Sequence, residues 1–290
     1  APQASAAASP AQRAATYLAR AQNADGGWGA VPRARTSAAQ TSWAVVGLAA
    51  AGYDPLRVRT RGRTPLALLR SYASRSRATA DLQRTAIALA AAGLTVPRDL
   101  RARLRADQRR DGSWDGLVNL TSFGIIALRA SGSSTSDGAV RRARSWLARR
   151  QSRDGGFNFA GAGRSGVDDT AAAVQALVAS GLRRSRAVRR AAAWIAARQN
   201  PDGGFALTPP GSSNAQSTAY AVQALVAAGR DPDRVRRPGS RTPLAYLRSL
   251  QQSSGLVRYS RTSAQTPIWV TSQALAAFAR RPLPFRLRRR

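Results

Sequence analysis

Two kinds of helical pattern alternate along the chain. In the stretch 186–198, Val188, Ala191, Ala192 and Ile195 recur on one side, and the arginines lie outside that stripe. Such spacing predicts an amphipathic helix with one buried face. Each stretch of this kind is followed by an alanine-rich segment that ends in glycine, as in TAAAVQALVASG up to Gly181. The pattern therefore predicts pairs of helices, an outer one and a more deeply buried inner one.

A recurring turn, Gln-x-x-Asp-Gly-Gly/Ser-Trp/Phe, joins the two helices of a pair. Aromatic and aliphatic residues five and four positions before the Gln indicate that it ends a helix with a buried stripe. We expect the Gly after Asp to supply the left-handed cap that stops this helix. Clear copies of the turn begin at Gln22, Gln108, Gln151 and Gln199, and a degenerate copy begins at Gln251.

Six helical hairpins follow from these signals, at a spacing of roughly 40 to 50 residues. The second hairpin lacks the turn, but its RTPLALLRS (63–71) nearly matches RTPLAYLRS (241–249). We predict an all-α fold, an (α/α)6 toroid, over an open solenoid because neither end shows a polar capping repeat. The expected hairpins span about 11–52, 64–93, 97–132, 138–181, 185–229 and 241–280, between a flexible segment at 1–10 and a basic tail at 281–290.

Composition bears on the partners of the protein more than on its fold. The formal net charge is +32, every basic residue is Arg, every acid is Asp, and His, Cys and Met are absent. Because the arginines are spread along helix faces, we predict no specific nucleic-acid binding and consider an anionic cell-envelope polymer or lipid surface as a partner. The Ala-, Ser-, Pro- and Gln-rich opening predicts the processed start of a secreted or cell-envelope protein.

The inner helices carry two different faces. Aligned on their Leu (Leu177 in the fourth hairpin), they share a Thr, Val/Ile and Leu stripe that we expect to pack on the outer helix. The opposite face mixes amides with aromatic rings, and in a closed toroid it would line a central cavity. Ordinary packing of rings between helices is an equally good alternative. The predicted ligand-binding residues on this face are Trp43, Asn119, Phe123, Gln175, Gln216, Tyr220, Gln223, Trp269 and Gln273.

The stretch Gly166-Val-Asp-Asp-Thr-Ala holds the only pair of adjacent carboxylates in the chain. The helical register turns Asp168 toward the expected cavity, and Asp169 follows it directly, so both are candidate catalytic residues. The alternative is a structural role, in which Asp169 or Thr170 caps the N-terminus of the helix.

The repeated turns resemble the QW motifs of squalene and terpene cyclases and the related repeats of protein prenyltransferase β subunits. This resemblance covers nearly the whole chain, and it implies an α/α toroid with an isoprenoid-like ligand. The acidic stretch is similar to the Asp-x-Asp-Asp-Thr-Ala motif of class II cyclases, in which the middle Asp, here Asp168, donates the proton. The first Asp of that motif is Gly166 in this chain, and the cyclases usually combine two such domains.

The resemblance to prenyltransferases stops at their zinc site, which needs Cys and His ligands that this chain lacks. We therefore predict no metal site and no cofactor. Two functions remain open. In one, the cavity binds an apolar, isoprenoid-like small molecule, with or without proton donation by Asp168. In the other, the chain is a secreted, non-catalytic binding or structural toroid. A glycosidase is least favoured, because no second acid lies on an inward face.

Overall fold

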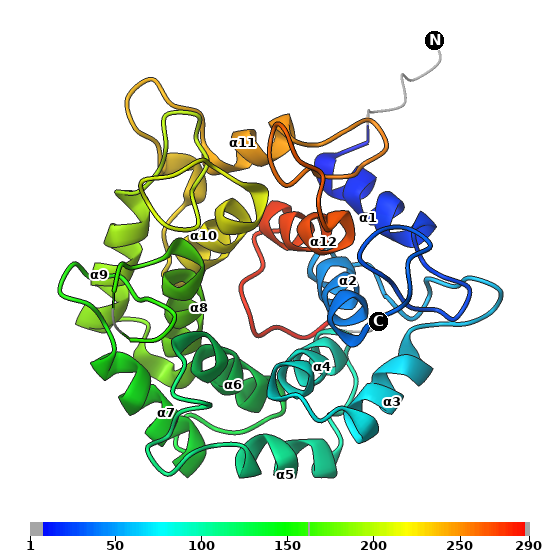
Figure 1. Ribbon diagram of the computed structural model, residues 1–290, viewed down its shortest axis with the longest axis horizontal. Helices are drawn as coiled ribbons and strands as arrows, with labels where there is room; N and C mark the ends of the chain where they lie inside the picture. The colour runs from blue at the N-terminus through cyan, green and yellow to red at the C-terminus, as the bar shows by residue number, and fades with distance from the viewer. Residues whose placement is uncertain (1–7, 162, 288–290) are drawn as a thin grey trace.

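The computed structural model describes residues 8–161 and 163–287. Over these residues it contains twelve α-helices and no strand, and Figure 1 shows the helices as two concentric rings. The predicted (α/α)6 toroid is confirmed. The outer helices are α1 (Pro10–Arg20), α3 (Leu66–Arg75), α5 (Arg98–Ala106), α7 (Gly138–Arg149), α9 (Arg186–Ala196) and α11 (Pro243–Ser249). The inner helices are α2 (Ala38–Ala50), α4 (Thr79–Ala91), α6 (Val118–Ala130), α8 (Val167–Leu177), α10 (Ala215–Ala227) and α12 (Pro267–Phe278).

The ring closes where the last inner helix, α12, packs against the first, α2 (Figure 1). A Cβ on Gly47 of α2 would lie 2.7 Å from the carbonyl oxygen of Ser272, so only glycine allows this close approach. The outer ring is closed by Gln251, whose side-chain amide donates to the carbonyl of Pro10 at 2.8 Å and whose Oε1 accepts from Arg13 at 2.8 Å. The first and sixth hairpins are therefore bonded neighbours.

The repeated Gln ties each hairpin to the next one. In the third hairpin, the Nε2 of Gln108 donates both to Gly112 O within its own turn and to Ala139 O at the start of α7, each at 2.9 Å. Gln151 makes the same pair of bonds, to Gly155 and Ala187. The side-chain amide thus satisfies carbonyls of two repeats at once, which explains why Gln recurs at this position.

The glycine of the turn has a different role from the one we expected. Its φ is positive, +88° at Gly26 and +96° at Gly155, but α1 and α7 have already ended at Arg20 and Arg149. The prediction that this glycine caps the helix is wrong. It supplies the left-handed residue inside the turn, where the preceding Asp accepts a backbone N–H two residues ahead, as Asp154 does from Gly156 at 2.9 Å.

After α12 the chain crosses the end of the barrel at which the inner helices finish (Figure 1). Leu283 is buried there, and its N–H donates to Oε1 of Gln175 at 2.8 Å, while Leu287 N–H donates to Ala91 O at 3.0 Å. The expected basic tail is thus a packed closing segment over residues 281–287, and 288–290 lie outside the described residues. So do residues 1–7 of the expected flexible segment, whereas Ser9 caps α1.

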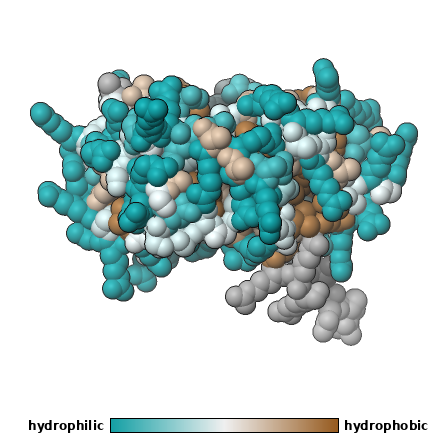
Figure 2. All heavy atoms as spheres, turned by 90° about the horizontal axis from the view of Figure 1, so that it is seen from below, coloured by the Kyte–Doolittle hydropathy of each residue, from teal (hydrophilic) through white to brown (hydrophobic). Residues whose placement is uncertain are grey.

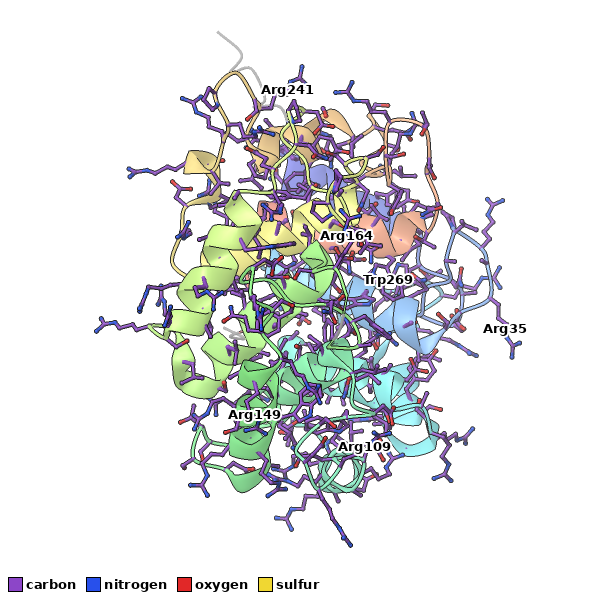
Figure 3. All side chains as sticks on the ribbon, turned by 60° about the vertical axis from the view of Figure 1, so that its left-hand side comes forward. Arg35, Arg109, Arg149, Arg164, Arg241 and Trp269 are labelled. Atoms are coloured by element: carbon purple, nitrogen blue, oxygen red, sulfur yellow. The ribbon has the colours of Figure 1, made fainter. Side chains whose placement is uncertain are left out.

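The outside of the toroid is polar. Figure 2 shows hydrophilic side chains over most of the edge that it presents, and Figure 3 shows Arg35 and Arg109 extending from the outer surface. No helix in the described ranges is both long and apolar enough to cross a membrane.

Candidate ligand cavity on the barrel axis

A cavity of ≈ 120 Å³ lies at the end of the barrel where the inner helices begin. Ala80, Asn119, Asp168 and Gln216, from the first turns of four inner helices, are half-buried around it. One turn deeper, Trp43, Phe123 and Tyr220 are buried. The closing segment covers the other end of the barrel, so we call the end at which the inner helices begin the mouth. The full lining of the cavity is Trp43, Ala80, Gln83, Arg84, Asn119, Leu120, Phe123, Asp168, Gln216, Tyr220 and Trp269.

Seven of the residues singled out from the sequence meet in this cavity, and four do not. The amides Gln175, Gln223 and Gln273 are almost fully buried beneath the aromatic layer, which separates them from the cavity. Gln175 is bound to the closing segment, and Gln273 reaches the side chain of Tyr220. Asp169 lies beside the cavity without lining it. The seven are Trp43, Asn119, Phe123, Asp168, Gln216, Tyr220 and Trp269.

The aromatic residues form one cluster centred on Trp43. Its ring centroid lies 6.0 Å from that of Phe123 and 6.4 Å from that of Tyr220, both nearly edge-to-face, and 5.9 Å from that of Trp269. Figure 3 shows Trp269 on the inner side of the ring. These geometries are favourable packing arrangements. These rings therefore have both of the roles considered. They pack against one another on the barrel axis, and the side of the cluster nearest the mouth lines the cavity.

Asp168 stands at the start of α8, whose N-cap is Gly166 with no side-chain hydrogen bond to the helix. The capping role considered for Asp169 and Thr170 is therefore wrong. Asp168 is half-buried, and its Oδ1 is shielded from solvent with no hydrogen-bond partner among the described residues. Burial raises the pKa of Asp168 to about 7, the Ser217 hydroxyl that donates to it acts in the opposite direction, and the charge of Asp169 adds to the rise.

Asp169 has a milder environment than its neighbour. Burial raises its pKa to about 6, and a hydrogen bond from the Asn119 amide opposes that rise. Both carboxyls are thus poised to exchange a proton near neutral pH, which is the property required of a general acid.

Arg84 is the one charged residue of the cavity lining that was not predicted from the sequence. Its guanidinium lies 5.4 Å from the ring centroid of Trp269 and donates from Nη1 to Oδ1 of Asp81 at 3.0 Å. The signal was available, because aligning α4 on Leu89 puts Ala80 and Arg84 at the positions of Asp168 and Ala172. A cation therefore stands where other repeats have an aromatic ring.

The cavity is small for a complete isoprenoid. An enclosed space of about 150 Å³ holds one benzene molecule, and pockets for drug-sized ligands measure roughly 300–1,000 Å³. The 120 Å³ found here suits an end group of about five carbons. A longer molecule would have to leave the rest of its chain at the open mouth.

Two family models cover this arrangement. The prenyltransferase alpha-alpha toroid domain matches residues 3–86 and 170–267, and the squalene-hopene cyclase C-terminal domain matches residues 76–209. The first match takes in more than half of the chain. The chain belongs to the prenyltransferase alpha-alpha toroid family, with a fold of the terpene cyclase type.

Solved structures agree on the fold. An ent-copalyl diphosphate synthase from Streptomyces platensis is 24% identical with a TM-score of 0.56, over 84% of this chain and 50% of that one. A protein from Actinoplanes is 18% identical with a TM-score of 0.58, over 93% and 98%. A glycosyl hydrolase family 88 structure from Bacteroides vulgatus is 12% identical with a TM-score of 0.51, over 70% and 73%. The chain spans about half the length of the synthase. None of the curated proteins matches the sequence.

Proposed function

We propose that the toroid binds an apolar, isoprenoid-like small molecule by taking its end group into the mouth cavity, and that binding rather than turnover is its main activity. The observation that carries the proposal is the cavity itself, to which Trp43, Phe123, Tyr220 and Trp269 supply aromatic walls. The match of residues 76–209 to the squalene-hopene cyclase C-terminal domain supports the choice of ligand class.

The absence of turnover is supported by Arg84. A terpene cyclase must stabilise a carbocation, which aromatic faces do well. A guanidinium in the same layer adds a positive charge where that cation would form, and it raises the energy of such an intermediate. The loss of an acid at Gly166 and the small volume favour binding for independent reasons.

Titration calorimetry with prenol, geraniol and farnesol tests this proposal. We expect one molecule bound per chain, and we expect Ala80→Phe to weaken binding at least about tenfold by filling the cavity. Ala39→Phe is the matched control, because Ala39 has the same register in α2 but does not line the cavity. No measurable binding of any of the three alcohols, or equal effects of both variants, would overturn the proposal.

Proton donation by Asp168 to an alkene or epoxide is the second candidate function. Its support is the acid with a pKa of about 7 whose Oδ1 has no partner among the described residues. Purified protein incubated with squalene and shorter polyprenyl substrates should then give cyclised products that Asp168→Asn abolishes. If wild type and Asp168→Asn yield the same product profile, Asp168 is not the donor.

A further inference from the structure

The cavity contains a positive charge that an apolar ligand does not use. Arg84 reaches it from α4, at the depth of Trp43, Phe123 and Tyr220, and its side chain is 26% exposed. Both Arg84 and Asp168 act electrostatically on Tyr220, because the charge of Asp168 raises the pKa of the phenol and that of Arg84 lowers it, after burial as the main cause of the rise. Arg84 is therefore part of the cavity wall and not of the outer surface.

Two contacts orient the guanidinium and leave most of it available. Trp269 covers one face at 5.4 Å, and Asp81 accepts a bond from Nη1 at 3.0 Å. A guanidinium carries five N–H donors, and among the described residues Asp81 is the only one shown to accept from Arg84. The guanidinium of Arg84 thus stacks on an aromatic ring and is bonded to a carboxylate at one edge, and together these contacts fix its plane. A fixed plane reduces the entropy lost when a ligand binds.

The carboxylate that pairs with Arg84 stands outside the cavity lining. Asp81 lies on the preceding turn of α4 with 32% of its side chain exposed, and it is not part of the cavity lining. Asp168 is the one acid in that lining, and burial favours its neutral form. The inner helices also begin at the mouth, so the positive ends of their dipoles add to the charge of Arg84.

A planar oxyanion matches a planar fork. Carboxylates accept two parallel N–H bonds from a guanidinium, whereas an alcohol offers a single weaker acceptor. The 120 Å³ volume holds a five-carbon unit with a carboxylate more readily than one with a bulkier tetrahedral phosphate. We propose that the end group taken into the cavity bears a carboxylate, which Arg84 binds while the aromatic side chains cover the carbon skeleton. This inference rests on the proposed function, because it names the chemistry of the ligand that the same cavity takes.

Calorimetry with two ligands of one skeleton tests the inference. 3-Methylbut-2-enoate and prenol have the same five-carbon frame and differ in the head group. On the unmodified protein we expect the carboxylate to bind at least about tenfold more tightly, the difference between a charge-assisted and a neutral hydrogen bond. Dimethylallyl phosphate separates carboxylate from phosphate recognition. If it binds more tightly than the carboxylate, the carboxylate assignment is overturned.

The variant Arg84→Met keeps the length of the side chain and removes the charge. We expect it to bring 3-methylbut-2-enoate down to the affinity of prenol, while Arg84→Lys keeps part of the preference. Arg248→Met, an exposed arginine on α11, is the matched control and should change neither affinity.

The outcomes separate the two proposals. If prenol binds but the carboxylate has no advantage on the unmodified protein, the inference fails and the proposed function stands. A preference that survives in Arg84→Met also overturns the inference. If neither ligand binds, the inference fails, and binding of geraniol and farnesol then decides the proposed function. The comparison of ligands on the unmodified protein decides the matter even if Arg84→Met does not fold.

Discussion

Helices α4 and α8 present the same three positions of the barrel face with opposite chemistry. In α8 an acid stands at the mouth, a small residue lies below it and an amide is deepest. In α4 a small residue stands at the mouth, a cation lies below it and an aliphatic residue is deepest. The positions hold Ala80, Arg84 and Ile87 in α4, and Asp168, Ala172 and Gln175 in α8.

The difference shows two ways in which a charged side chain can be accommodated in one partly buried cavity. The guanidinium of Arg84 has two partners, a hydrogen bond to Asp81 and a stacking contact with Trp269. Asp168 has the Ser217 hydroxyl as a partner for one oxygen and none among the described residues for Oδ1, so burial favours its protonated form. Substitutions in the two helices, and one at the N-cap of α8, test this contrast.

Asp168→Asn should have the largest effect on stability, and the effect should depend on pH. The folded state holds a proton up to about pH 7, whereas the unfolded chain loses it near 4. The contribution of Asp168 to the free energy of unfolding is therefore fully present below about pH 4. It is lost as the pH rises through 7, by up to about 4 kcal/mol. We expect Asn to remove most of this fall, so the variant is more stable than wild type at pH 8.

Urea unfolding at pH 5 and pH 8 measures this change. Asp169 leaves a smaller slope in the variant, since its own pKa is raised to about 6. The exposed Asp99→Asn is the control and should follow wild type. An unchanged pH slope in Asp168→Asn would contradict the pKa that we assign to this carboxyl.

Gln175→Met should destabilise the protein by about 1–3 kcal/mol, because it leaves the buried N–H of Leu283 without an acceptor. Ile87→Met at the matched position of α4 removes no hydrogen bond and should cost less. Urea unfolding of the two variants gives the comparison. Equal losses would mean that the closing segment gains nothing from its bond to α8.

Arg84→Met should change the free energy of unfolding by less than about 1 kcal/mol, since its ion pair with Asp81 is partly exposed and methionine keeps the packing of the stem. The thermal midpoint at pH 7 measures it, beside Arg248→Met. A large loss would show that Arg84 supports the fold and is not free to serve a ligand.

Gly166→Asp should have the smallest effect on stability. A Cβ there would lie 3.3 Å from Leu207 O and 3.4 Å from Oδ2 of Asp169, so it fits after a small shift. A capping side chain adds a few tenths of a kcal/mol, and the new charge should raise the pKa of Asp169 above its value of about 6. Gly166→Asn gives the cap without the charge. Carboxyl NMR titration of Asp169 in both variants measures the effect of the charge. Identical titration curves would show that the new carboxylate does not change the pKa of Asp169.

The fold was predictable because its signals are local and repeated. In the turn copies at Gln22, Gln108, Gln151 and Gln199, the Gln side chain donates to a carbonyl of the following hairpin or of the segment that leads into it. The same residue type therefore recurs wherever one hairpin packs on the next. The closing segment was not predictable in this way. The hydrogen bond between Leu283 and Gln175 joins residues 108 positions apart in the sequence. It is not repeated in the other hairpins, so no sequence pattern predicts it.

The sequence predicts which helix face surrounds the cavity, but not how far the cavity extends along the barrel axis. Helical alignment brings Trp43, Asn119, Phe123 and Asp168 to one face, and that face does surround the cavity. The same alignment cannot tell how far down the aromatic rings close the axis, because this depends on how Trp43 packs against rings from three other helices. The deep amides, such as Gln223, share the register of this face, but the aromatic rings lie between them and the cavity.

The bond from Gln251 to Pro10 has a consequence for how the molecule comes apart. An open stack of repeats has two end units with one neighbour each, and it melts inward from them. In this ring every unit has two neighbours, so none is predisposed to fray. Breaking any one junction exposes two apolar faces at once, and the chain should therefore unfold as a single cooperative unit instead of losing its hairpins one by one.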